Sequence, residues 1–298
     1  MSHPPIVIAH RGASGYLPEH TLPAKALAHG MGADFLEQDV VGSRDGALLV
    51  FHDLYLDQLT DVAECFPGRA RSDGLHYCID FTLPELRELR VTERRRRNGP
   101  GARFPGRFPA DTGTFRLHTL EEELEFIQGL NRSTGRRAGV YAEIKDPAWH
   151  QQHDFTLGDR LIETLRSFGY GTEADGFFVQ CFSAPELRRV RAKYGAEMPL
   201  IQLLDEGASV TPAALSEIAQ YARGIGPDIS LAWPDTGLCS LARQMGLLVH
   251  PFTFRADQLP EGFTSFNELL TTFVEVLGVH GVFTDFPDLV VRYLKQSG

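Results

Sequence analysis

Two short clusters of polar residues carry side chains that could hydrolyse a phosphate ester. His10 and Arg11 follow the apolar run 6–8, and His52 follows the apolar run 48–51. Histidine can give or take a proton near neutral pH, and the planar fork of arginine matches two oxygens of a phosphate. A single histidine at a strand end is most often structural, whereas two with polar companions indicate chemistry. We therefore predict a proton-transfer pair, with Arg11 as a phosphate ligand.

Three carboxylates follow similar apolar runs. Glu37 and Asp39 are two residues apart, so in a strand both side chains point to the same face. Glu143 follows the run 139–142, and Lys145 comes two residues later. One such acid alone usually forms a surface ion pair, but three at strand ends favour a hard cation, Mg²⁺ or Ca²⁺. Lys145 adds a second positive charge for a phosphate.

These clusters require strands whose ends meet, and the rest of the chain supplies them. Strand-like and helical patterns alternate over most of its length, which favours a parallel α/β fold, and a (β/α)8 TIM barrel fits this length best. No glycine-rich nucleotide-binding loop follows a strand. Strands are expected at 139–144, 177–180, 200–204, 224–226, 247–250 and 281–284, and helices at 119–130, 155–168, 184–194, 212–222, 239–245, 266–276 and 288–295.

The alternation breaks in two places. Between Asp39 and His52 there is no room for a helix, and 43–46 reads as a tight turn, so a hairpin is expected. The stretch 54–116 is rich in Arg, Gly and Pro and has weak periodicity. We interpret it as an insertion within one barrel domain, 1–298, placed above the barrel mouth beside His52. Its arginine run, 94–97, is either a solvated face or an attractor for an anionic substrate.

Composition narrows the class of protein. The chain has 298 residues, 39 acidic and 29 basic, with a net charge of -10, which does not favour a nucleic-acid partner. No apolar run approaches the roughly 18 residues of a membrane-spanning helix. The first residues lack a secretory signal, so a cytoplasmic protein is expected, or a periplasmic one if a signal has been removed. Cys65 and Cys78 could pair in an oxidising compartment, although two free thiols are the simpler interpretation.

Other hydrolytic chemistries fit less well. The chain has no Gly-x-Ser-x-Gly elbow for a serine hydrolase. Cys181 follows a strand but has no evident histidine partner for a thiol nucleophile. A two-carboxylate glycosidase suits a barrel, but it would leave His10, Arg11 and His52 without a task.

Together these motifs extend over nearly the whole chain and resemble one family, the glycerophosphodiester phosphodiesterases. The similarity looks closest to the bacterial periplasmic branch, which carries an insertion after the His-Asp motif. The matching stretches are HRGASGYLPEHT at 10–21, FLEQD at 35–39, VFHD at 50–53, 81–83, YAEIK at 141–145, QCF at 180–182, IGPD at 225–228, 250–251 and TDFPD at 284–288.

The resemblance implies a TIM barrel with an irregular early segment, in agreement with the expected hairpin. One residue, His20, departs from the wider family, where many members carry Asn, but the insertion-bearing branch shares it. The resemblance also implies a function for each candidate residue. By this resemblance His10 and His52 are the catalytic acid and base, Glu37, Asp39 and Glu143 hold one Ca²⁺ or Mg²⁺, and Arg11 and Lys145 contact the phosphate.

The expected function is metal-dependent hydrolysis of glycerophosphodiesters to sn-glycerol 3-phosphate and an alcohol. One alternative is a related phosphodiesterase acting on lysophospholipids, which would need an apolar rim around the pocket. Another is a protein that binds organophosphates without catalysis, which would have no need for a histidine pair. The insertion either walls the pocket and limits the alcohol half of the substrate or is a surface module without a part in substrate choice.

Overall fold

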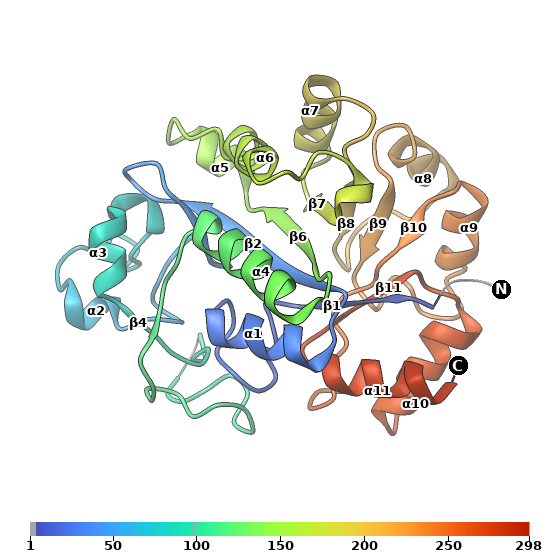
Figure 1. The fold of residues 1–298 in the computed structure, drawn as a ribbon, viewed down its shortest axis with the longest axis horizontal. Coiled ribbons are helices and arrows are strands. Elements are labelled where there is room, and N and C mark those ends of the chain that lie inside the picture. Colours follow the sequence, from blue (N-terminus) through green and yellow to red (C-terminus); the bar gives the residue numbers. More distant parts are fainter. Residues whose placement is uncertain (1–3, 98, 298) are drawn as a thin grey trace.

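The computed structural model describes residues 4–97 and 99–297, so residues 1–3, predicted to lack a signal, lie outside it. Within the described residues, eight parallel strands form a nearly closed barrel, in the neighbour order β10-β9-β8-β7-β6-β2-β1-β11 (Figure 1). The TIM-barrel prediction is confirmed. The strands are β1 (Ile6–Ala9), β2 (Phe35–Gly42), β6 (Gly139–Ile144), β7 (Phe177–Cys181), β8 (Leu200–Leu204), β9 (Gly224–Pro227), β10 (Leu248–Val249) and β11 (Gly281–Thr284).

Backbone hydrogen bonds also link the segments next to β10 and β11, the two strands at the ends of this order. The amide of His280 donates to the carbonyl of Val249 at 2.9 Å, and the amide of Phe254 donates to the carbonyl of Phe283 at 2.8 Å. Every residue of β6, β7, β8, β9 and β11 is buried, as expected where helices cover the outside of a parallel sheet. The carboxyl ends of all eight strands therefore meet at one face of the barrel.

Helices surround the barrel (Figure 1). Thr119 caps α4, as its sequence predicted, because its hydroxyl accepts from the amide of Glu122 at 3.3 Å. The expected helix 212–222 ends earlier, since Tyr221 and Ala222 are buried in the turn that leads into β9. The helices between strands are α1 (Leu22–Met31), α4 (Leu120–Thr134), α5 (Pro147–Gln151), α6 (Leu157–Ser167), α7 (Ala184–Tyr194), α8 (Pro212–Ile218), α9 (Leu238–Gln244), α10 (Phe266–Thr271), continued by a π-helical turn (Thr272–Val276), and α11 (Pro287–Ser297).

The predicted hairpin is present. Strand β3 (Leu48–Val50) runs antiparallel to β2, with Val40 opposite Val50. The hydroxyl of Ser43 accepts from the amide of Ala47 at 2.8 Å and holds the turn. This arrangement extends β2 beyond the barrel and returns the chain to the barrel mouth at His52.

The segment 54–116 contains short elements and an apolar cluster of its own. They are α2 (Val62–Cys65), a 3₁₀ turn (Cys78–Asp80), α3 (Leu83–Glu88) and the two-stranded ladder β4 (Arg90–Val91) with β5 (Phe115–Arg116). Figure 1 shows α2 and α3 on the side of the molecule away from α7–α9. The apolar cluster includes Val41, Leu49 and Phe51 of the β2–β3 hairpin, so the segment packs on the hairpin.

Two further expectations concern side chains and helix length. Cys65 is exposed, Cys78 is buried, and both are free thiols, so the simpler interpretation holds. Among the helices described, none combines the length and the apolar composition that crossing a membrane requires.

Candidate active site

A cavity of about 240 Å³ opens at the carboxyl ends of the strands. A larger groove of about 1020 Å³ lies elsewhere, between α4 and the segment 113–118, and contains none of the predicted site residues. The structure brings all seven of those residues to the wall of the smaller cavity: His10, Arg11, Glu37, Asp39, His52, Glu143 and Lys145.

Strand register explains why the carboxylates meet. Asp39 of β2 is paired with Glu143 of β6, and Glu37 lies two residues earlier on the same face of β2. All three carboxylates are buried, with exposures of 1% for Glu37 and Asp39 and 6% for Glu143. The parallel pairing of two neighbouring strands thus concentrates negative charge at one point of the barrel mouth.

The electrostatics show that this charge is only partly balanced. Burial and the neighbouring charge of Asp39 hold the pKa of Glu37 well above its usual range. Burial raises the pKa of Glu143 to about 8, although Lys145 opposes the shift. The ammonium of Lys145 lies 2.7 Å from Glu143 Oε1 and 3.6 Å from Asp39 Oδ1. A further positive charge at this cluster would be stabilised.

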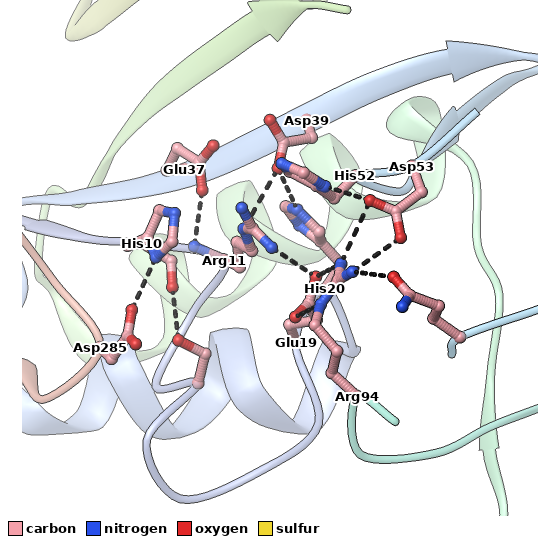
Figure 2. A network of polar contacts seen from close by, with 12 residues as sticks. His10, Arg11, Glu19, His20, Glu37, Asp39, His52, Asp53, Arg94 and Asp285 are labelled. Atoms are coloured by element: carbon pink, nitrogen blue, oxygen red, sulfur yellow. Dashed lines mark hydrogen bonds and ion pairs between the residues drawn. The ribbon is translucent and has the colours of Figure 1, made fainter. Parts of the chain in front are cut away.

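Each candidate histidine is held through the same ring nitrogen. Nδ1 of His10 lies 2.6 Å from Asp285 Oδ1, and Nδ1 of His52 lies 2.5 Å from Asp53 Oδ1 (Figure 2). A carboxylate at Nδ1 orients the ring and leaves Nε2 for a proton transfer. Burial, followed by the charge of Arg11, lowers the pKa of His10 to about 4 and that of His52 to about 3. Both rings are therefore neutral at pH 7 in the free protein.

A tight turn after β1 places Arg11 in the cavity. Arg11 has a φ of 60°, in the left-handed region, and its amide donates to Glu37 Oε2 at 2.6 Å. Gly12 follows with a φ of 89°, and a Cβ there would lie 2.8 Å from the backbone of Ala24, so only glycine fits. Such strained backbone is typical of functional sites, where the surrounding contacts maintain it.

His20 lies beside the carboxylate cluster, although the sequence analysis gave it no part in catalysis or cation binding. Its Nε2 lies 2.8 Å from Asp39 Oδ2, while its Nδ1 is buried without a partner among the described residues. Ligand atoms of His20, Glu37 and Asp39 all lie within 4.8 Å of one another. The sequence signal was the motif position itself, since only tertiary structure brings His20 to β2.

A network of ion pairs joins the site to the insertion (Figure 2). Arg94 donates to Glu19 Oε1 and to Asp53 Oδ2, each at 2.7 Å, and Arg11 donates to the same Glu19 oxygen at 2.7 Å. The side chain of Arg94 is only 5% exposed. The interpretation of the run 94–97 as a solvated face is thus wrong for Arg94, because two largely covered carboxylates, 9% and 10% exposed, bind its guanidinium.

Three more arginines at the cavity were not predicted. Arg103 and Arg255 line it, and Arg107 reaches Asp285 at 2.7 Å from the insertion. Asp285 had a readable signal, because it directly follows the strand 281–284. Arg103 and Arg107 had none, since their positions depend on how the insertion folds.

Comparison with known proteins agrees with this geometry. The family model described as the glycerophosphoryl diester phosphodiesterase family matches residues 10–289. The chain belongs to this family. A glycerophosphodiester phosphodiesterase from Haemophilus influenzae is 41% identical, over 97% of this chain and 90% of that protein. The resemblance drawn from the motifs is confirmed.

Solved structures show the same fold. A glycerophosphoryl diester phosphodiesterase structure from Silicibacter pomeroyi has a TM-score of 0.77 and 24% identity, covering 99% of this chain and 95% of that one. A phosphodiesterase from Oleispira antarctica in complex with its product sn-glycerol-3-phosphate has a TM-score of 0.70 and 22% identity, covering 98% of this chain and 97% of that one.

Proposed function

We propose that this chain hydrolyses glycerophosphodiesters to sn-glycerol 3-phosphate and an alcohol, assisted by one divalent cation, Ca²⁺ or Mg²⁺. The observation that carries the proposal is the pair of histidines, each held at Nδ1 by a carboxylate, on the wall of the cavity that contains the buried carboxylate cluster. The curated Haemophilus relative and the Oleispira product complex support the substrate class.

The carboxylate cluster fits a hard cation. Glu37, Asp39 and Glu143 are buried together, and burial raises the pKa values of Glu37 and Glu143, so ionising all three carboxyl groups is unfavourable without a further positive charge. A cation bound there would favour the ionised forms. His20 Nε2 already bonds Asp39, so His20 orients that carboxylate, and the carboxylates are the oxygen ligands that such ions prefer. A cation held there would neutralise charge developing on the phosphate oxygens.

The other candidate residues bind the phosphate or transfer protons. Arg11 and Lys145 bind the phosphate oxygens, because both carry buried positive charge at the cavity wall. Nε2 of one histidine removes the proton of the nucleophile, which is water or the neighbouring hydroxyl of the glycerol. If the hydroxyl attacks, the alcohol leaves from a cyclic phosphate, and water then opens the ring to give sn-glycerol 3-phosphate. Nε2 of the other, His10 or His52, protonates the departing alkoxide, and the bound phosphate anion favours its protonated form.

The pocket rim does not favour the lysophospholipid alternative. Among the described residues, the exposed large apolar side chains are Phe182, at 44%, and Val276, at 73%, and only Phe182 lines the cavity. The half-buried ring of Phe252 lines the cavity beside it, with 6.0 Å between the two ring centroids. Two phenylalanine rings cover far less surface than an acyl chain exposes. A small polar alcohol therefore suits this rim better.

The test is release of choline from glycerophosphocholine and from lysophosphatidylcholine, with and without EDTA, with sn-glycerol 3-phosphate identified as the other product from glycerophosphocholine. We expect turnover of glycerophosphocholine that EDTA abolishes and excess Ca²⁺ or Mg²⁺ restores. Binding of glycerophosphocholine without any turnover at saturating cation would overturn the proposal in favour of a binding protein. Faster turnover of lysophosphatidylcholine would shift it to the lipid substrate.

A further inference from the structure

A second cavity, of about 60 Å³, adjoins the first on the side of the insertion. Five residues line both cavities, namely His10, Arg11, His52, Arg103 and Arg255, so the histidine pair and Arg103 lie at the boundary between them. The first continues past the carboxylates to Gln180, whose Oε1 is buried without a partner among the described residues and can accept from a glycerol hydroxyl. The second cavity therefore lies where the alcohol half of a phosphodiester would extend.

The wall of the second cavity is unusually basic. Five arginines line it, against the two carboxylates of Glu19 and Asp285. Four of the arginines face those acids directly. Arg11 and Arg94 share Glu19, while Arg107 and Arg255 reach Asp285 Oδ2 at 2.7 and 2.9 Å.

Arg103 is the fifth, and it differs from the others. Within residues 4–97 and 99–297 its guanidinium has no carboxylate partner, and its side-chain contact is the ring of Phe104, with 5.2 Å between the guanidinium carbon and the ring centroid. Burial, followed by the charges of Arg255, Arg94 and Arg11, lowers the pKa of Arg103. Arg103 remains an exposed residue, and the charge of Glu19 opposes this shift of its pKa. Like charges brought together disfavour the charged form, and an added anion would relieve that cost.

The backbone holds Arg103 in this position. Its amide donates to the carbonyl of Arg94 at 2.7 Å, and the amide of Arg96 donates to the carbonyl of Gly101 at 3.0 Å. These bonds fold the segment into a hairpin that starts from the buried Arg94. The centroid of the Phe104 ring also lies 3.8 Å from the guanidinium carbon of Arg107 and 5.8 Å from that of Arg255. One aromatic ring therefore lies next to three guanidinium groups.

We propose that Arg103, supported by Arg255, binds an anionic group on the alcohol half of the substrate. The group is a carboxylate or a terminal phosphate, since a guanidinium binds both in the same bidentate way. This inference rests on the proposed function, because it names the substrates that the same site prefers. The reacting phosphate itself is bound in the first cavity by Arg11 and Lys145, beside the carboxylates.

Two matched pairs of substrates test the proposal. Glycerophosphoglycerol and its terminally phosphorylated form differ by one phosphate, and glycerophosphoethanolamine and glycerophosphoserine differ by one carboxylate. We expect Arg103→Gln to lower kcat/KM about tenfold or more for the members with the extra anion, as for a lost charge-assisted hydrogen bond, and much less for their partners. Arg96→Gln is the control, because Arg96 is an exposed arginine of the same hairpin that lines neither cavity.

The outcomes distinguish a phosphate from a carboxylate as the ligand of Arg103. They also distinguish failure of this inference from failure of the proposed function. A selective loss on the phosphate pair or on the carboxylate pair identifies that group as the ligand. An equal loss on all four substrates would overturn the inference and place Arg103 on the reacting phosphate. Calorimetric binding of the terminally phosphorylated substrate in EDTA gives a readout without turnover: about tenfold weaker binding by Arg103→Gln supports the subsite even if hydrolysis fails, and equal binding refutes it.

Discussion

The two sides of the active-site cavity are built in opposite ways. The side formed by β2 and β6 gathers carboxylates, and strand register alone sets Asp39 beside Glu143. The side formed by the insertion gathers arginines, and no ladder places them there. Arg94 and Arg107 instead come from a distant segment and are held by two acids of the barrel, the partly buried Glu19 and the buried Asp285.

The two ways of placing side chains, by strand register and by ion pairs, suit different tasks. Register places side chains to within fractions of an ångström at little cost, because the strand hydrogen bonds are made in any case. Ion pairs across a long insertion need buried charges on both partners and cost desolvation. The first construction suits a cation site and proton transfer, and the second suits recognition of the variable part of a substrate.

The largest effect should follow a change on the carboxylate side. Glu37→Gln, Asp39→Asn and Glu143→Gln should each weaken cation binding and lower turnover by orders of magnitude, because each removes a charged oxygen ligand. Calorimetric titration of Ca²⁺ and Mg²⁺ measures the first effect and product release the second. Glu125→Gln, on the exposed face of α4, is the control. Full activity in EDTA-treated protein would exclude the cation altogether.

The next largest effect concerns His10 and His52, which lie between the two sides of the cavity. His10→Ala and His52→Ala should fold normally and lose about 10²-fold or more in kcat, as expected for a general acid and base. Because both serve one step, the double variant should lose less than the product of the single losses. Thermal midpoints report folding. A double variant whose loss equals that product would contradict the shared step.

A smaller effect is expected on the arginine side. Arg94→Gln removes the bond to Asp53, the carboxylate that holds His52, so kcat should fall about tenfold. Because Glu19 and Asp53 already hold the guanidinium of Arg94, which acts through His52, KM should change little. The same substitution at the exposed Arg96 should alter neither constant. A rise in KM with an unchanged kcat would show that Arg94 binds substrate instead.

The last effect on that same side concerns the stability of the fold and leaves catalysis unchanged. Burial, with the charge of Glu19, raises the pKa of Glu93 from 4.5 to about 7, and Glu93 Oε2 is buried without a partner among the described residues. The folded chain keeps this proton between about pH 4.5 and 7 while the unfolded chain loses it, so Glu93 lowers the free energy of unfolding as the pH rises through that window.

Glu93→Gln should remove this loss. Relative to the unmodified chain, the variant should gain stability between pH 5 and pH 8, by at most about 3 kcal/mol. Urea denaturation at the two pH values measures the gain. A difference between the two chains that is the same at both pH values would mean that Glu93 is ionised in the folded state throughout.

The local pattern of apolar residues was enough to predict most strands of the barrel. Strands 139–144, 200–204 and 281–284 were predicted with the bounds that the structure shows, because their apolar residues are buried on both faces. The predicted site residues lie together because polar residues after such strands must meet at the carboxyl end. Helix ends were less predictable, since a buried turn such as Tyr221 and Ala222 repeats the apolar pattern of a helix.

The amino-acid sequence by itself determined the barrel, the early hairpin and seven of the residues that line the cavity, because period, turn residues and strand ends are local properties. Only the tertiary structure decided that Asp285 holds His10, that His20 bonds Asp39, and that Arg94 and Arg103 lie at the site. Those contacts join residues far apart in the chain, and they form only once the barrel closes and the insertion packs on Phe51 and its neighbours.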